Sequence, residues 1–249
     1  MKKSKENVLL KKILSLFENL NRGKVLDLGA ASGHYSVGLK ERGFDVVAAD
    51  VTDRFKYADS IKYLKLKENS ALPFDDNAFD FVLMAEVIEH LRNPYTILRD
   101  ISRVLKTGGG LILSTPNILN VKSRMRFLVE GSFEYFREPP LDHVIYNARN
   151  GIDVSQVHVV PYRFHELEFL LSENGFDVEK VDTSVYEGTW LKFLVPLIRL
   201  QLNNKAQRSL KKGGLDYRRI NRYLLSPELL QGRHLIVLAK KTTSRGIHD

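Results

Sequence analysis

The chain has 249 residues, of which 43% are hydrophobic and 27% charged, enough for one α/β domain with modest additions. It contains no cysteine, which excludes disulfides, thiolate metal sites and any mechanism that needs a cysteine nucleophile. The net charge of +8 is unevenly placed, because residues 184–249 hold 13 Lys and Arg against 4 Asp and Glu while the rest is nearly neutral. A polyanion or an anionic membrane surface would therefore meet the C-terminal part.

The N-terminal segment predicts an amphipathic helix and not a signal peptide. Residues 8–20 are apolar but interrupted by Lys11, Lys12 and Glu18. No stretch of the chain reaches the roughly 20 uninterrupted apolar residues that a membrane-spanning helix needs. We therefore expect a soluble, cytoplasmic protein.

From residue 23 onward, short apolar runs alternate with segments of helical period, which is typical of βαβ units. We expect strands at 23–28, 44–50, 61–66, 79–85, 109–115, 176–184 and 233–240. Helices are expected at 32–42, 94–105 and 164–173. The predicted fold is α/β, with a seven-stranded, mostly parallel Rossmann-like sheet, helices on both faces, and a last strand that returns without a helix and runs antiparallel.

Two long connections follow the fifth and sixth predicted strands. Residues 117–160 and 187–231 far exceed ordinary loop lengths, and such insertions are often lids or binding elements. We expect a single domain, divided as a helix (1–21), a cofactor-binding half (22–116), a substrate lid (117–160), the end of the sheet (161–186 and 232–241) and a basic, apolar insertion (187–231).

A glycine turn between two strands suggests the ligand. Gly29 and Gly33 follow the first strand, and Asp50 ends the second, where an acid can accept a ribose hydroxyl pair. Asp27 lies two residues before the turn, where its charge would repel a pyrophosphate and attract a ligand with ammonium and sulfonium groups. The turn also lacks G-x-G-x-x-G, since Ala31 and His34 occupy two glycine positions. S-adenosylmethionine fits better than NAD.

Seven elements in order carry a family resemblance. They are Val25–Gly33, Ala49-Asp50, Leu72-Pro73-Phe74 leading to Phe79-Asp80, Glu86-Val87-Ile88-Glu89-His90-Leu91, Leu105–Gly109, Ser114–Asn117 and Leu167–Phe176. Over residues 20–185 the chain resembles the class I S-adenosylmethionine-dependent methyltransferases, in the branch similar to the ubiquinone-biosynthesis O-methyltransferases. Ala31, for a glycine, and Thr107, for a proline, depart from the family pattern.

The resemblance implies where S-adenosylmethionine binds. Its methionine portion would meet Asp27 and the backbone from Gly29 to Gly33, and its ribose would meet Asp50. An acid four residues before Leu72 binds adenine in the family; here that residue is Glu68, with Asn69 as a second candidate. The complete set of expected cofactor residues is Asp27, Gly29, Ala30, Gly33, Asp50, Val51, Glu68, Asn69, Met84 and Ala85.

Histidines near the cofactor are the candidate bases for methylation of a hydroxyl. His158 is the first candidate and His90 the second, and Glu86 could orient either one. We see no Asp and Asn spacing suited to a magnesium-bound catechol, so we expect no metal. The expected reaction is methyl transfer to a small-molecule acceptor, on oxygen by resemblance only.

The apolar and basic segment 190–222 leaves the partners open. It could lie in a membrane interface and meet a lipid-linked or prenylated acceptor, or it could cover the core or a dimer contact. RNA methylation through this segment and a non-catalytic role in S-adenosylmethionine binding remain as alternatives. Nucleic acid is the weaker alternative, because no RNA-binding module is recognisable.

Overall fold

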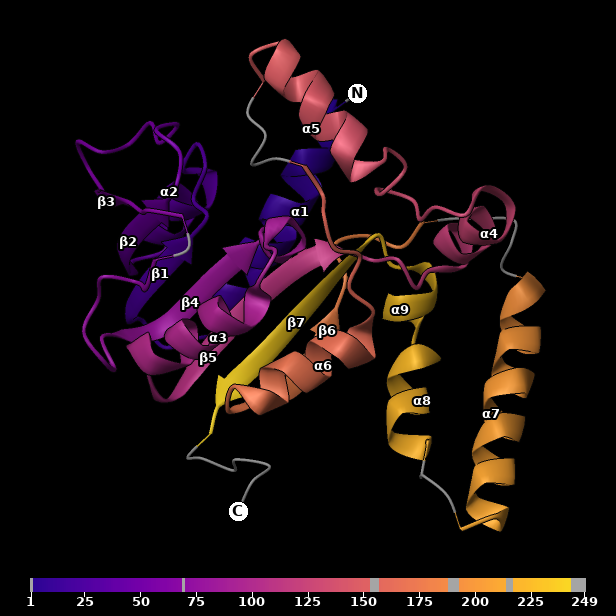
Figure 1. Ribbon diagram of the computed structural model, residues 1–249. Helices are drawn as coiled ribbons and strands as arrows, with labels where there is room; N and C mark the ends of the chain where they lie inside the picture. The colour runs from indigo at the N-terminus through magenta and orange to yellow at the C-terminus, as the bar shows by residue number, and fades with distance from the viewer. Residues whose placement is uncertain (1, 69, 153–156, 188–192, 214–216, 243–249) are drawn as a thin grey trace.

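The computed structural model describes residues 2–68, 70–152, 157–187, 193–213 and 217–242. Seven strands form one sheet in the order β3-β2-β1-β4-β5-β7-β6 (Figure 1). They are β1 (Lys24–Leu28), β2 (Asp45–Asp50), β3 (Lys62–Lys65), β4 (Phe79–Ala85), β5 (Leu105–Pro116), β6 (Phe176–Asp182) and β7 (His234–Lys241). The strands from β1 to β5 pair in parallel, and β7 runs antiparallel to β5 and β6. The predicted sheet and its antiparallel last strand are confirmed.

Helices cover both faces of this sheet, because the strands present apolar side chains alternately to each side. One core packs against α3 (Pro94–Val104) and α6 (Phe164–Glu173), and it includes Met84. The other core packs against α1 (Lys2–Phe17) and α2 (His34–Glu41), and it includes Leu83. The expected helices at 32–42, 94–105 and 164–173 are therefore present, and they enclose the sheet.

The long insertions contain helices that the sequence reading did not place. After β5 come α4 (Val121–Glu130) and α5 (Pro140–Arg149); after β6 come α7 (Val195–Lys211), α8 (Arg218–Leu224) and α9 (Pro227–Gln231). The expectation of a non-helical return to β7 is wrong, since α9 ends three residues before that strand. Ser226 caps α9 by accepting from the Leu229 amide, and Pro227 occupies its first turn. None of the described helices has the length and apolarity to cross a membrane.

Asn117, at the end of β5, ties the last insertion to the sheet. Its buried Nδ2 lies 2.8 Å from the Gly232 carbonyl and 3.0 Å from that of Leu229, and its Oδ1 accepts from the Leu119 amide. These bonds satisfy carbonyls at the C-terminal end of α9 that have no partner within the helix. They also fix where β7 enters the sheet beside β5.

Phe17 anchors α1 on the sheet and gives a stability prediction. Its fully buried ring makes edge contacts with Phe44 and Phe81 at centroid distances of 5.4 and 6.0 Å. Phe17→Ala leaves a cavity there, and we expect a loss of about 3–5 kcal/mol in urea unfolding. Phe169→Ala on α6 is the control, because that ring is 59% exposed, and its effect should stay within about 0.5 kcal/mol. Equal midpoints for both variants would contradict this packing.

Candidate functional site

Four polar residues meet at the carboxyl edge of the parallel strands. Asp27 and Asp50 lie at the ends of β1 and β2, and Glu86 and Ser114 lie at the ends of β4 and β5. β1 pairs with both β2 and β4, which places this edge where the strand order reverses. Ligands bind α/β sheets at such a crevice. The strands therefore bring the predicted cofactor residues to one place.

The turn after β1 adopts the backbone conformation that the glycine pattern predicts. Gly29 and Gly33 have φ values of +79° and +88°, and Ala31 between them has φ of +45°. The amides of Gly29 and Ala30 donate to the Ala49 carbonyl at 2.8 and 3.2 Å. Gly33 then caps the start of α2. The turn thus joins β2 by backbone bonds and presents a helix N-terminus at the site.

Asp50 holds this turn in place. Its buried carboxylate accepts from the Ala31 amide at 2.7 Å and from the Thr52 amide at 2.8 Å. A carboxylate has about four acceptor positions, so these two bonds leave capacity for a ribose hydroxyl pair. The arrangement fits the role expected for Asp50 and adds a second one, since the same carboxylate shapes the glycine turn.

Asp27 lies beneath the turn and is 1% exposed. It accepts from the Ser36 hydroxyl of α2 at 2.5 Å. The pKa of Asp27 is raised to about 6, mainly by burial and in smaller part by the nearby Asp50, while the Ser36 hydrogen bond opposes the shift. A group this deep would act on a cofactor amino group through water or backbone, as the family resemblance implies.

Side chains that the sequence reading missed form the walls of the turn. A Cβ atom on Gly29 would lie 2.3 Å from the Val87 side chain, and one on Gly33 would lie 2.7 Å from the Phe55 ring. Phe55 stacks on Tyr63 at a centroid distance of 4.7 Å. The aromatic residues that follow Asp50 were the available signal. Both glycines are required here by close packing as well as by their φ values.

The remaining cofactor candidates are less informative. Ala30 is buried, whereas Val51 and Glu68 are exposed near the same edge of the sheet. Met84 is fully buried in the core with α3 and α6, so only its backbone could face a ligand, while Ala85 is partly exposed. Asn69 lies outside the described residues.

Glu86 ends β4 in the left-handed region, with φ of +55°. Its carboxylate accepts from the Ser114 hydroxyl at 2.9 Å, and its Oε2 lies 3.9 Å from His234 Nε2. Burial in this recess raises the pKa of Glu86 to about 7, although the Ser114 bond and Arg233 oppose the shift. The expected orienting contact with His90 or His158 is not among its hydrogen bonds; Glu86 engages Ser114 instead.

Glu89 is fully buried and was not predicted as a site residue. Its Oε2 accepts from the Thr115 hydroxyl at 3.0 Å, and its Oε1 has no hydrogen-bond partner in the described part of the chain. Burial and the neighbouring Glu86 raise the pKa of Glu89 well above its usual value. The spacing of Glu86, Glu89 and His90 directly after a buried strand was the signal that could have found it.

The two predicted histidines come together next to Glu89. The rings of His90 and His158 lie 4.8 Å apart between centroids. Because a carbonyl only accepts, His90 Nδ1 donates to Val157 at 3.0 Å and His158 Nδ1 donates to Tyr135 at 2.9 Å. Burial lowers both pKa values, so the rings are neutral at pH 7. Each Nε2 therefore carries an available lone pair.

This cluster could hold a metal ion. One ligand atom each from Glu89, His90 and His158 lies within 4.8 Å of the others. Two imidazoles and a carboxylate form a donor set for zinc, iron or manganese, and the Nδ1 bonds to carbonyls fix the rings as in many metal sites. The spacing of acids and amides in the sequence predicts no metal site, whereas this cluster favours one.

Comparisons with known proteins agree with this geometry. A family model described as "Methyltransferase domain" matches residues 1–181. The chain is 25% identical over 190 residues to a ubiquinone biosynthesis O-methyltransferase of Rickettsia bellii, covering 69% of this chain and 79% of that protein. The fold is shared with a solved SAM-dependent methyltransferase of Archaeoglobus fulgidus, with a TM-score of 0.54 and 18% identity over 93% of this chain and 91% of the other. It is also shared with one of Aquifex aeolicus, with a TM-score of 0.53 and 19% identity over 93% of this chain and 88% of the other.

The raised pKa of Asp27 predicts how stability depends on pH. Asp27 binds a proton more tightly in the folded protein than in the unfolded chain, so its contribution to stability is fully present below about pH 4 and is lost as pH rises through about 6. This loss amounts to roughly 3 kcal/mol for a shift of about two pH units. Asp27→Asn removes the titrating group. Between pH 4 and 6.5, the free energy of unfolding in urea should therefore fall by that much less in the variant than in the wild type. Identical pH profiles for the two proteins would contradict the raised pKa of Asp27.

Proposed function

We propose that this chain, which belongs to the methyltransferase-domain family and takes its methyl group from S-adenosylmethionine, methylates a hydroxyl oxygen of a small molecule. The observation that carries the proposal is the pair of neutral histidines, His90 shortly after β4 and His158 in the insertion after β5, whose Nδ1 atoms both donate to carbonyls and leave Nε2 as an acceptor. A hydroxyl must lose its proton during methylation, whereas an amine can be methylated as the free base. The named activity of the Rickettsia relative supports the same choice.

The residues around the glycine turn would hold the methyl donor. S-adenosylmethionine, when bound, supplies a methyl group already activated by its sulfonium. Asp50 would accept the ribose hydroxyls, and the backbone from Gly29 to Gly33 would receive the methionine portion. Glu68 remains the candidate for the adenine amino group. Phe55 and Val87 would exclude water on two sides of the turn.

His158 is the better placed base. Its Nδ1 bond to the Tyr135 carbonyl comes from the lid segment, so an acceptor held by the lid meets a ring that the lid orients. The neutral Nε2 would take the hydroxyl proton. His90 lies beside it, with its own Nδ1 fixed by Val157. Such a base contributes typically 10²–10⁴-fold to the rate.

A second candidate mechanism uses the same cluster to hold a divalent cation. The unpartnered Oε1 of Glu89 favours it, since a buried carboxylate oxygen without a partner is costly. A bound cation would lower the pKa of the acceptor hydroxyl and reduce the need for a base. In that case Glu89, His90 and His158 act as ligands, and the expectation of a metal-free reaction is wrong.

The cofactor assignment predicts a binding defect in Asp50→Ala. The loss of two hydrogen bonds to a charged group should weaken S-adenosylhomocysteine binding at least about tenfold in calorimetry. Asp53→Ala is the matched control, because that carboxylate lies in the same loop, is largely exposed and pairs with Lys65. Unchanged affinity in Asp50→Ala would contradict the assignment.

The catalytic assignment predicts a defect in turnover without a defect in cofactor binding. In an assay of S-adenosylhomocysteine release with a panel of phenols and catechols, His158→Gln should lower kcat about 100-fold or more. Its affinity for S-adenosylhomocysteine should stay within about twofold. His165→Gln on α6 is the control, and it should retain activity. The wild-type rate should fall at acid pH as the histidine protonates, and because burial lowers the pKa of His158 the fall should come at a lower pH than for a free imidazole.

A chelator separates the two mechanisms. If His158 acts as the base, EDTA leaves turnover unchanged. If the cluster holds a cation, EDTA abolishes turnover and added Mn²⁺ or Zn²⁺ restores it in the wild type but not in Glu89→Gln. If the protein methylates RNA and none of the small hydroxyl compounds, the proposed acceptor class is refuted. If it binds the cofactor but turns over no acceptor, a non-catalytic role is favoured.

A further inference from the structure

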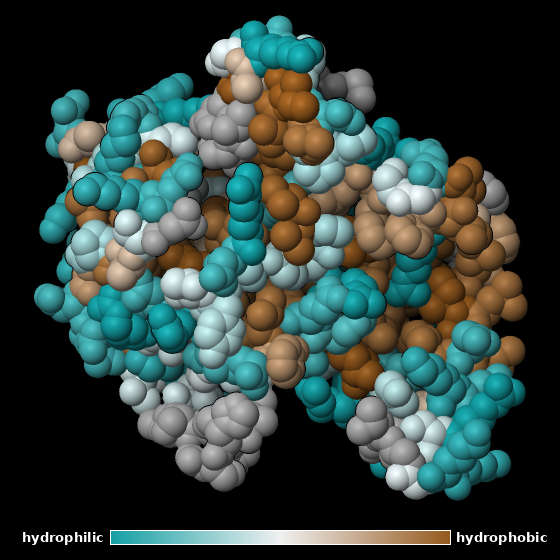
Figure 2. All heavy atoms as spheres, viewed as in Figure 1, coloured by the Kyte–Doolittle hydropathy of each residue, from teal (hydrophilic) through white to brown (hydrophobic). Residues whose placement is uncertain are grey.

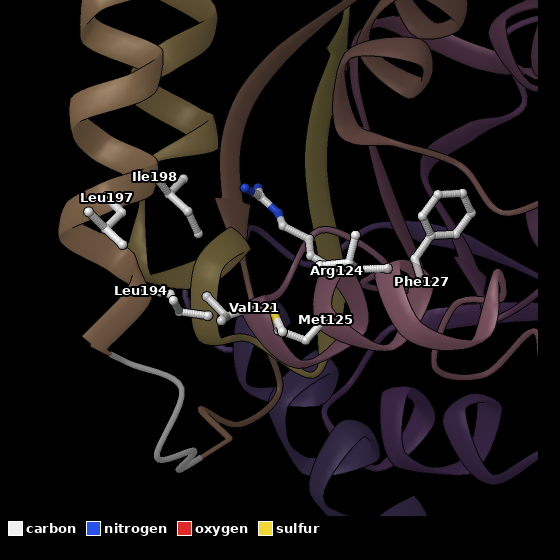
Figure 3. A pocket seen from close by; sticks show the side chains of 8 residues that line it. Val121, Arg124, Met125, Phe127, Leu194, Leu197 and Ile198 are labelled. Atoms are coloured by element: carbon white, nitrogen blue, oxygen red, sulfur yellow. The ribbon is translucent and has the colours of Figure 1, made fainter.

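A groove of about 530 Å³ lies between α4 and α7 (Figure 3). Val121 and Met125 of α4 meet Leu194 and Ile198 from the α7 side at its base. Its volume is in the range of small-ligand pockets. The family model ends at residue 181, so the α7 wall belongs to the part of the chain outside that match.

The rims of this groove are apolar side chains exposed to solvent. Leu128 of α4 is 75% exposed and Leu197 of α7 is 61% exposed, and Phe127 and Leu200 extend the surface. Figure 2 shows this apolar area at the right of the molecule, with hydrophilic side chains toward the lower end of α7. Contiguous exposed apolar surface of this kind usually marks a binding site.

Arg124 places a positive charge inside the groove. Its Nε donates to the Leu119 carbonyl at 2.6 Å, and no carboxylate of the described residues forms an ion pair with it. The neighbouring basic residues of α4 do have an anionic partner, since Lys122 and Arg126 both form ion pairs with Glu134. Figure 3 shows the guanidinium extending from α4 to the level of Ile198. A cation removed from water without an anion is unfavourable, so the groove has an unmet requirement for negative charge.

We propose that this groove binds a long-chain carboxylate, with the head group on the Arg124 guanidinium and the alkyl chain between α4 and α7. A planar carboxylate matches, in a bidentate bond, the two Nη groups of Arg124, which have no partner among the described residues. The unbranched chain matches an open, apolar trough. A flat bilayer surface fits less well, because Arg124 lies within the groove and not on its rim.

The groove connects with the candidate active site through the lid. Lys122 and Arg126 of α4 pair with Glu134, which is followed by Tyr135, the residue whose carbonyl accepts from His158. A ligand bound between α4 and α7 would therefore stabilise α4. Through its ion pairs with Glu134, α4 holds the neighbouring Tyr135, whose carbonyl orients the His158 ring. The lipid proposal does not depend on which acceptor is methylated.

Calorimetry on the full chain tests the proposal with three probes below their micelle concentrations. Dodecanoate carries both features, dodecanol only the chain and acetate only the head group. We expect dodecanoate to bind, dodecanol to bind at least about tenfold more weakly, and acetate not to bind. Arg124→Gln should weaken dodecanoate about tenfold and remove its advantage over dodecanol. Leu128→Ser should weaken both alkyl probes alike.

Matched controls separate this site from general effects of charge and apolar surface. Arg99→Gln on α3 removes the same charge from an exposed position outside the groove, and Phe169→Ser removes an exposed ring from α6. Both should bind dodecanoate as the wild type does. S-adenosylhomocysteine affinity should be equal in all variants, so a failure here is distinguishable from failure of the cofactor site.

Three results would overturn the proposal. The first is dodecanoate binding that is equal in Arg124→Gln and Arg99→Gln. The second is no dodecanoate binding while vesicles of phosphatidylcholine and phosphatidylglycerol sediment the protein, which assigns the surface to a bilayer. The third is a dimer in ultracentrifugation that Leu128→Ser dissociates, which assigns the groove to a second copy of the chain.

Discussion

The carboxyl edge of the sheet depends on burying acidic side chains next to single hydroxyl donors. Ser36 donates to Asp27, Ser114 to Glu86 and Thr115 to Glu89. None of these three acids forms an ion pair with a described Lys or Arg, and burial raises all three pKa values. A hydroxyl offsets only part of the cost of desolvating a carboxylate. The edge therefore favours a cationic ligand, which is the character of a sulfonium methyl donor, and disfavours a pyrophosphate.

The two parts of the site differ in how firmly they are held. The glycine turn is fixed by Asp50 and by bonds to the Ala49 carbonyl, all within the parallel sheet. The histidine pair instead depends on carbonyls of Val157 and Tyr135, which belong to the long insertion after β5. Movement of that insertion would change the imidazole orientation while leaving the turn intact. This division suits an enzyme whose donor site is constant and whose acceptor site closes on its substrate.

The features that could be predicted from the sequence are those that depend on residues close together along the chain. Strand periodicity and the acids at strand ends are local, so the sheet and the place of Asp27 and Asp50 follow from the sequence. Ser226 and Pro227 signal the start of α9, but this helix has only five residues, which is too short to show a helical period in the sequence. Glu89 was missed for another reason: its carboxylate comes within 4.8 Å of a His158 ring nitrogen only when the insertion after β5 folds back onto the end of β4. The role of Arg124 could not be predicted from the sequence, because the groove that it lines forms only when α7 lies beside α4.

Glu89 also bears on the choice between a base and a metal. If its carboxyl is protonated, the charge is lost, but Oε1 still has no hydrogen-bond partner among the described residues. If it is ionised, a negative charge is buried beside Glu86. In either state, one ligand atom each of Glu89, His90 and His158 lies within 4.8 Å of the others, and both imidazoles offer only a lone pair at Nε2 because their Nδ1 atoms donate to carbonyls. A divalent cation would satisfy the oxygen and both Nε2 atoms at once, whereas a hydroxyl acceptor alone can donate only one proton to the cluster.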